Sequence, residues 1–330
     1  MTRNFIRKAE LLALGVIGLV TVLLVVTGCT GPAGPAGAAG VNAAATCTEC
    51  HNNDTSMVLA KSLQLGLSET GHSNFEVAAT EGIRPTCGGC HSNEGYLRRM
   101  AANIAPDKVT VTELNPTPPG CFTCHKIHST YTKADFALTS TAPVTFYMSG
   151  KTFDKGKGNL CVTCHQTRTV PPAVGVGTVK VTSTRWGPHY GAQSEVLLGT
   201  LGYGPSASSN PHYAMIADSC VQCHMNGENH EMKPVIAACT PCHKDATNFD
   251  INKLQTTAKA QYTELENLLL AKKMITKAAD GSISVVAGEY PEAVAGALWN
   301  YRVIYSDGSN GVHNPTYVKA MLASAIAALK

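Results

Sequence analysis

The feature that most constrains this chain is the five-residue pattern Cys-x-x-Cys-His, which occurs six times within 330 residues. The six copies begin at Cys47, Cys87, Cys121, Cys161, Cys220 and Cys239. They use twelve of the thirteen cysteines, and only Cys29 stands outside a copy. We refer to them in chain order as the first to the sixth motif. The gaps between them are too uneven for a repeat protein built on one period.

Three other uses of paired cysteines fit the pattern less well. Zinc sites combine Cys-x-x-Cys units, but they do not require a His directly after every second Cys. A thioredoxin-like redox pair needs one motif on a βαβ framework, whereas this chain has six motifs together with 30 Gly and 17 Pro. Cysteines that only form structural disulfides have no reason to keep a single spacing. The pattern therefore indicates covalent attachment of a prosthetic group.

In these motifs the chain resembles the multihaem c-type cytochromes, in which Cys-x-x-Cys-His attaches haem. Two sulfurs at this spacing reach the two vinyl groups on one edge of the macrocycle, and the adjacent His ligates the iron from below. The resemblance implies six covalently bound haem c groups. The implied thioether residues are Cys47, Cys50, Cys87, Cys90, Cys121, Cys124, Cys161, Cys164, Cys220, Cys223, Cys239 and Cys242. The implied proximal iron ligands are His51, His91, His125, His165, His224 and His243.

Six low-spin haems would need six further iron ligands beyond the motif histidines, and the chain has six histidines outside the motifs. They are His72, His128, His189, His212, His230 and His313. Neutral imidazole ligates iron readily, so we expect pairs of histidines at the irons. The alternatives are ordinary surface histidines, an open position at an iron, or a Met ligand, for which Met225 and Met232 lie nearest a motif.

Local context supports several of these distal candidates. Pro precedes both His189 and His212, and its fixed backbone leaves a ligand little entropy to lose. His313 precedes Asn314 and Pro315, which read as the cap and the first residue of a helix continuing to Leu329. His128 and His230 follow their nearest motifs too closely to reach the opposite face of the same iron. We expect both to serve neighbouring haems, with the sixth motif as the candidate for His230.

Two segments outside the motifs add to the resemblance. Residues 186–225 and 300–329 are similar to segments of the outer-surface cytochromes of metal-reducing bacteria. That family includes polymerising hexahaem and tetrahaem members. The resemblance implies that His189, His212 and His313 are distal ligands.

The N-terminus has the layout of a lipoprotein export signal. Arg3, Arg7 and Lys8 precede sixteen uncharged residues, a stretch that is short for a membrane span. Val26-Thr27-Gly28-Cys29 resembles the bacterial lipobox, which predicts a signal peptide over residues 1–28 and lipidation of Cys29. The alternative is an uncleaved anchor helix. Thr30, where Asp would indicate inner-membrane retention, favours the outer membrane, at its periplasmic or cell-surface face. Residues 29–45 then form a Gly/Pro/Ala-rich leash.

The expected fold is mainly α-helical with much irregular structure and few short strands, organised by a stack of haems. We expect a hexahaem electron-transfer region over residues 46–250, with short helices at the motifs. Residues 251–330 would form a helical bracing region that supplies His313. The patterning predicts strands over 108–114 and 176–183, helices over 254–278 and 292–306, and a turn at Asp280-Gly281.

These features predict an electron carrier rather than an enzyme. The chain has no Lys/Arg cluster, which excludes nucleic acid as a partner. Its expected partners are other redox cytochromes or extracellular metal acceptors, with a membrane contact through the N-terminal lipid. One alternative is a reductase of nitrite, hydroxylamine or a sulfur oxyanion with one open haem. Another is a homo-oligomeric subunit of a cytochrome filament.

Overall fold

A computed structural model describes residues 50, 55–67, 71–205 and 209–330, all within one structural unit, Glu49–Lys330. The predicted signal peptide, Cys29 and the leash lie outside the described residues, as do Cys47 and His51 of the first motif. None of the described helices is both long enough and apolar enough to cross a bilayer.

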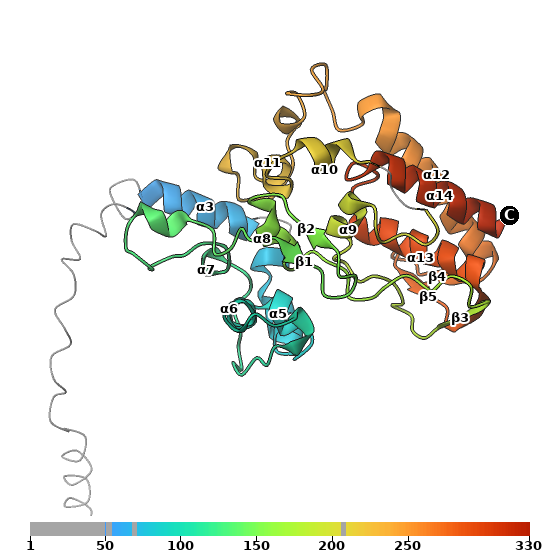
Figure 1. Ribbon diagram of the computed structural model, residues 1–330, viewed down its shortest axis with the longest axis horizontal. Helices are drawn as coiled ribbons and strands as arrows, with labels where there is room; N and C mark the ends of the chain where they lie inside the picture. The colour runs from blue at the N-terminus through green and yellow to red at the C-terminus, as the bar shows by residue number, and fades with distance from the viewer. Residues whose placement is uncertain (1–49, 51–54, 68–70, 206–208) are drawn as a thin grey trace, which may run out of the picture. The chain divides into compact units, whose positions relative to one another are not determined.

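Short helices dominate the chain before residue 254 (Figure 1). The α-helices there are α3 (Thr55–Leu67), α4 (Phe75–Val77), α5 (Gly88–His91), α6 (Asn93–Ala102), α7 (Cys121–Cys124), α8 (Gly158–Val162), α9 (Gln193–Leu198), α10 (Pro211–Met215) and α11 (Cys220–His224). Single turns of other kinds are the π-helix η2 (Ala78–Gly82) and the 3-10 helices η1 (Gly71–Ser73), η3 (Pro106–Lys108), η4 (Lys133–Phe136), η5 (Asn226–Glu228), η6 (Ile236–Ala238) and η7 (Ile251–Lys253). Helices α5, α7, α8 and α11 coincide with attachment motifs, as the sequence predicts. The prediction was wrong for the sixth motif, where residues 239–242 form a turn directly after η6.

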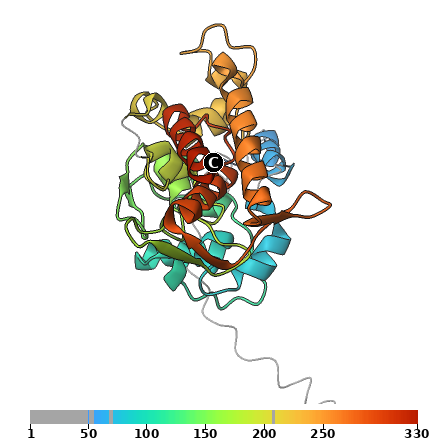
Figure 2. The ribbon, with the colours of Figure 1, turned by 90° about the vertical axis from the view of Figure 1, so that its right-hand side faces the viewer.

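Three longer helices pack together at the C-terminal end of the chain, as Figures 1 and 2 show. They are α12 (Leu254–Ala271), α13 (Glu292–Asp307) and α14 (Pro315–Leu329). Local chemistry sets their ends. Asn314 caps α14 by accepting a hydrogen bond from the backbone N–H of Tyr317, Pro315 follows at the first helical position, and Gly308 ends α13 with a left-handed φ of 69°.

The main hydrophobic core lies among these three helices. It centres on large buried side chains such as Trp299 and Tyr301 of α13, Leu265 of α12 and Leu322 of α14. Residues from earlier in the chain complete it, including Val196 of α9. The indole N–H of Trp299 donates to the carbonyl of Leu201 at 2.7 Å, which ties the loop after α9 to this core.

Within the described residues, the strands form three two-stranded antiparallel pairs. They are β1 (Val144–Thr145) with β2 (Thr152–Phe153), β3 (Thr178–Val181) with β6 (Gly288–Pro291), and β4 (Ile275–Lys277) with β5 (Ile283–Val285). In the β3–β6 pair Thr178 lies opposite Pro291 and Val181 opposite Gly288, so a segment between the fourth and fifth motifs is joined to the start of α13. This strand and α13 agree with the sequence prediction, as does the turn at Asp280-Gly281.

Two element predictions were wrong. Residues 109–114 have no strand partner in the described chain, and their polar groups are used differently: Arg98 of α6 donates to the carbonyl of Thr110 and to the carboxylate of Glu113. The predicted helix over 254–278 ends at Ala271. There Lys273 has a φ of 56° and the β-branched pair Ile275 and Thr276 begins the β4–β5 hairpin.

The apolar core is unevenly distributed along the chain. A second, small cluster contains Phe146, Phe153, Val162 and Leu197. In the described chain before Val144, the buried apolar residues are Ala78, Cys87, Tyr96 and Val109. So few buried side chains cannot supply the apolar surface that stabilises a domain, and the N-terminal half therefore fits a protein whose core includes prosthetic groups.

Candidate haem-binding sites

Five of the motif histidines face a histidine from elsewhere in the chain. The ring-centroid distances are 6.0 Å for His91 and His189, 6.1 Å for His125 and His230, 5.8 Å for His165 and His72, 6.3 Å for His224 and His313, and 6.3 Å for His243 and His212. Each pair joins one predicted proximal ligand to one predicted distal ligand, and the partners come from distant parts of the sequence. The structure thus brings together ten of the twelve predicted iron ligands.

The distances between these rings match what one metal ion between two imidazoles requires. A metal–imidazole bond is about 2.0 Å long and the ring centroid lies about 1.2 Å behind the ligating nitrogen, so two rings on opposite sides of an ion have centroids about 6.4 Å apart. The five pairs lie within 5.8 to 6.3 Å. Rings that stack on each other or pack edge to face span a wider range, from 4.5 to about 7 Å. The narrow range in all five pairs therefore fits coordination.

Hydrogen bonds orient six of the paired rings through Nδ1. The contacts are His125 to the Phe136 carbonyl at 2.7 Å, His165 to Gln193 Oε1 at 3.2 Å, His212 to the Val312 carbonyl at 2.7 Å, His224 to the Met232 carbonyl at 3.0 Å, His230 to the Glu228 carbonyl at 2.9 Å, and His313 to Asp307 Oδ1 at 2.6 Å. Because each of these oxygens can only accept, Nδ1 must carry the proton and donate. The lone pair of Nε2 is then left for a metal ion.

Burial keeps several of these rings in the neutral form that metal binding needs. Desolvation lowers the pKa of both His72 and His189 to about 4. The pKa values of His91, His224 and His230 are also lowered, and burial is again the largest cause. An imidazole with a lowered pKa is unprotonated at neutral pH and can donate a lone pair without first losing a proton.

Cysteines of different motifs lie in contact. The thiols of Cys90 and Cys164 are close enough to share a hydrogen bond, and those of Cys161 and Cys220 are as well. The fourth motif therefore contacts the second motif through one of its cysteines and the fifth motif through the other. Cys124 of the third motif also lies within electrostatic range of Cys164.

A buried arginine lies beside one of these contacts. Arg99 of α6 is 3% exposed, and its guanidinium approaches the sulfurs of Cys90 and Cys164 at 3.4 and 3.9 Å. It also lies over the ring of Tyr96, 5.2 Å from the centroid. Among the described residues, no carboxylate forms a salt bridge with it. A buried cation without an anion is costly, so this position suits an anionic group such as a haem propionate.

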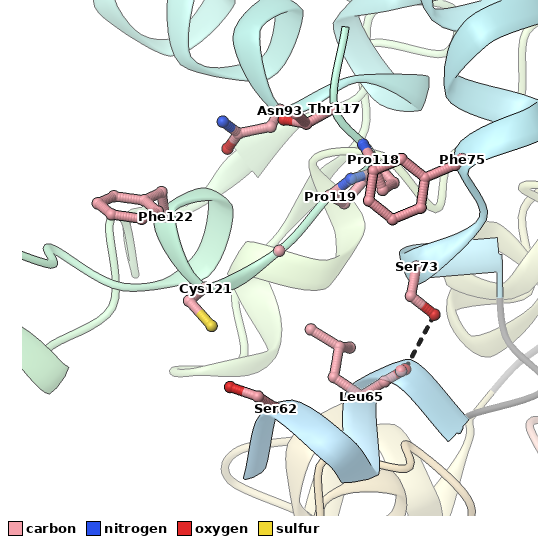
Figure 3. Close-up of a pocket in the computed structure, with 12 residues that line it drawn as sticks. Ser62, Leu65, Ser73, Phe75, Asn93, Thr117, Pro118, Pro119, Cys121 and Phe122 are labelled. Atoms are coloured by element: carbon pink, nitrogen blue, oxygen red, sulfur yellow. Dashed lines mark hydrogen bonds between the residues drawn. The ribbon is translucent and has the colours of Figure 1, made fainter. Parts of the chain in front are cut away.

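A cavity of about 270 Å³ adjoins the third motif (Figure 3). Leu65, Phe75 and two prolines supply apolar walls, and the sulfur of Cys121 points toward α3, which forms the opposite side. The same helix contacts the pair of His125 and His230, because Gln64 Oε1 accepts a hydrogen bond from the backbone N–H of His230. The cavity therefore offers apolar surface next to a predicted thioether position.

One expected pairing was wrong, and another lies partly outside the described residues. His230 faces His125 of the third motif and not the sixth motif, whose His243 faces His212 instead. The ring of His128 stacks on Tyr131 and meets Phe122 edge to face. The first motif's histidine is not among the described residues, so the expectation for His128 stays a prediction.

The five described pairs consist of histidine rings, and no methionine sulfur belongs to them. Met232 instead contributes its backbone carbonyl, which orients the ring of His224. In the described part of the chain, no group of three or more His, Cys, Asp or Glu side chains is arranged to hold a metal ion. The donor set is thus one of paired imidazoles beside Cys-x-x-Cys, and these residues fit haem c.

Sequence reasoning missed the residues that support these ligands. Asp307 and Gln193 hold ligand rings, and Arg99 lies between two motifs, yet none is part of a recognisable pattern. The one available signal was the position of Asp307 directly before a Gly and a few residues before His313 at a helix start. A carboxylate there can accept from a following His, but the sequence does not show that the chain turns back.

The fold that carries these sites is similar to one already seen in a solved structure. Among solved structures, it is similar to the outer cell wall cytochrome OcwA, with a TM-score of 0.50 and 23% sequence identity. The similarity covers 82% of this chain and 50% of that one, so the chain spans about half the length of the solved structure. No known family model matches the sequence, and no curated protein matches it either. The predicted resemblance to a multihaem cytochrome is confirmed at the level of the fold.

Proposed function

We propose that this protein is a hexahaem c-type cytochrome that transfers respiratory electrons along a chain of histidine-ligated haems. The observation that carries the proposal is the set of five imidazole pairs, each with centroids 5.8 to 6.3 Å apart beside a Cys-x-x-Cys unit. A haem at each motif would supply reversible one-electron exchange. The chain itself fixes the ligand rings, keeps several of them neutral by burial and holds neighbouring motifs in contact.

The contacts between motifs support a continuous route. The fourth motif links the second and the fifth, because Cys164 contacts Cys90 and Cys161 contacts Cys220. The loop between α13 and α14 links the fifth and the sixth. There the carbonyl of Val312 orients His212, which faces the sixth motif, and the next residue, His313, faces the fifth. Electron transfer between sites depends on such short separations, which these residues enforce.

The pairing speaks against a reductase as the main function. An enzyme acting on nitrite, hydroxylamine or a sulfur oxyanion needs an iron with an open position. At each of the five described pairs, both faces of the iron position would be taken by imidazole. Each described pair is also completed within one chain, so the filament alternative gains no support from a ligand shared between subunits.

We also propose that the protein is exported and held at the outer membrane by a lipid on Cys29. The support is the lipobox at Val26–Cys29 and the uncharged stretch before it. The fold is shared with a cytochrome whose name places it in the outer cell wall, and this agrees with an extracytoplasmic location. Its partners would be redox cytochromes or external metal acceptors.

The test is a haem count combined with a spin-state count on the full-length protein, expressed with haem maturation. Intact mass should show six covalent haems, and the ferric spectrum should be low-spin throughout. Reduced protein should leave carbon monoxide unbound. Fewer than six haems, or ready binding of carbon monoxide or cyanide by one iron, would contradict the proposal. Labelling with a radioactive fatty acid, with Cys29→Ser as control, tests the lipid separately.

A further inference from the structure

The ring of His313 has a hydrogen-bond partner that differs from those of the other oriented rings. Its Nδ1 donates to the carboxylate of Asp307 at 2.6 Å, whereas the other five printed contacts of this kind go to uncharged carbonyl or amide oxygens. Among the described histidine pairs, only that of His224 and His313 is thus shown with a carboxylate on a ligand ring. This difference is chemical and does not depend on small changes in distance.

The carboxylate is held firmly in place. Asp307 is the last residue of α13, and its side chain is 1% exposed. Its second oxygen accepts hydrogen bonds from the hydroxyl of Ser309 at 2.5 Å and from the backbone N–H of Ser309 at 3.3 Å. The Ser309 hydroxyl in turn accepts from the backbone N–H of His313 at 3.2 Å. These bonds close a small ring that fixes the carboxylate against the imidazole.

Burial increases the effect of this charge. A carboxylate acts more strongly on its neighbours in a low-dielectric interior than in water. The Asp307 carboxylate is almost fully buried and lies 2.6 Å from Nδ1 of His313, so its charge acts directly on this ring.

We propose that Asp307 lowers the reduction potential of the iron held by His224 and His313. The inference rests on the haem ligation proposed above. A carboxylate that pulls on the Nδ1 proton raises the electron density of the imidazole and makes it a stronger ligand. The stronger ligand and the buried negative charge both stabilise ferric over ferrous iron, which lowers the potential of the couple. Asp307 acts through His313 and is a positioning and tuning residue.

The place of this site in the route gives the tuning a consequence. The fifth motif contacts the fourth through Cys220, and it shares the α13–α14 loop with the sixth. Lowering the potential of a site between two others makes that site a steeper uphill step for an electron arriving from either neighbour. Asp307 would thus favour the passage of electrons from strongly reducing donors. It would slow the passage of electrons from weakly reducing donors.

The test is a potentiometric titration of the full-length holoprotein and of Asp307→Asn, followed in the visible spectrum. Asn offers the same acceptor oxygen without the charge, so His313 stays in place. We expect one of the six one-electron components to rise by at least 59 mV, the equivalent of a tenfold change in its equilibrium constant, and the others to stay within a few millivolts. Asp250→Asn is the matched control, because Asp250 is a surface carboxylate whose two oxygens accept hydrogen bonds from Thr256 near the start of α12.

The outcomes are separable from those of the proposed function. Six low-spin haems with no component shifted in Asp307→Asn would overturn the tuning role alone. A high-spin signal in Asp307→Asn would also overturn it, since it would show that the residue holds the ligand rather than tunes it. A wild-type protein with fewer than six haems would instead contradict the proposed function.

Discussion

The rings of His91 and His189 lie with their centroids 6.0 Å apart and their planes at 85°. His91 belongs to the second motif, in α5, and His189 lies in the loop that follows β3, directly after Pro188. The carbonyl of Pro188 accepts hydrogen bonds from the backbone of Arg168 and from the hydroxyl of Thr167. A site at the second motif is therefore assembled by residues that follow the fourth.

Removing a distal histidine should open one iron. In His189→Gly, the Cys-x-x-Cys-His unit of the second motif is unchanged, so the haem count should stay at six. One sixth of the low-spin signal should convert to a high-spin ferric signal, and that iron should bind cyanide. Added free imidazole should restore the low-spin spectrum, which separates the loss of a ligand from misfolding. An unchanged spin state would show that His189 is not a ligand.

The angles between ring planes predict two classes of low-spin signal in electron paramagnetic resonance. The pairs at the second and sixth motifs are near perpendicular, at 85° and 78°, whereas the pair at the third is closer to parallel, at 32°. Perpendicular rings leave two iron d-orbitals nearly equal in energy, which gives a highly anisotropic signal. Near-parallel rings separate these orbitals and give an ordinary rhombic signal. His189→Gly should remove one signal of the first class, and a spectrum with only rhombic signals would contradict the pairing.

The stability of the fold should depend on pH through Glu195. This side chain is fully buried in α9, and burial raises its pKa from 4.5 to about 7. Folding therefore takes up a proton between these values, so the stability that Glu195 contributes is fully present below pH 4.5 and is lost as pH rises through about 7. The loss is on the order of 3 kcal/mol for a shift of this size. In Glu195→Gln, thermal unfolding at pH 5 and pH 8 should differ less than in the wild type.

The control for that experiment follows from the hydrogen bonds of Glu195. Its carboxylate accepts from the backbone N–H of Thr167 and from the hydroxyl of Ser194, and the Gln oxygen can accept the same bonds. Glu289→Gln, a change in β6, tests whether any loss of a carboxylate gives the same result. An equal change of pH dependence in both variants would show that Glu195 has no special role.

A methyl group at Gly296 should destabilise the C-terminal core. A Cβ there would lie 2.1 Å from Cδ1 of Tyr203, and this ring has little freedom to move. The backbone N–H and carbonyl of Tyr203 both bond to Asn300, and its hydroxyl donates to Glu292. Gly296→Ala should therefore cost about 1 to 3 kcal/mol. Calorimetry of the holoprotein measures it.

Gly66 provides the matched comparison. It also lies in a helix, α3, but a Cβ there would meet nothing within 4 Å. Gly66→Ala should stabilise by about 0.5 to 1 kcal/mol, because the folded chain loses no contact and the unfolded chain loses freedom. Equal effects of the two substitutions would show that crowding by Tyr203 is not the cause.

The sequence could predict where longer helices begin or end because the residues that set these ends act locally. Asn314 and Pro315 start α14 through a side-chain bond and a fixed dihedral that need no distant partner. The strand over 108–114 was wrong because alternation alone does not supply a neighbouring strand. The predicted helix over 254–278 was too long because helical spacing does not show where a hairpin competes for the chain.

The sequence by itself determined the chemistry: six Cys-x-x-Cys-His units define where a macrocycle can attach, and the remaining histidines define what can complete its coordination. Only the tertiary structure decided that His189 faces His91, that His230 faces His125, and that Asp307 lies against His313. The physical reason is range. Covalent attachment depends on residues three or four positions apart in the sequence. The pairing of ligands and the placement of a charge depend on contacts between distant segments, which the packing of α9, α13 and α14 brings together.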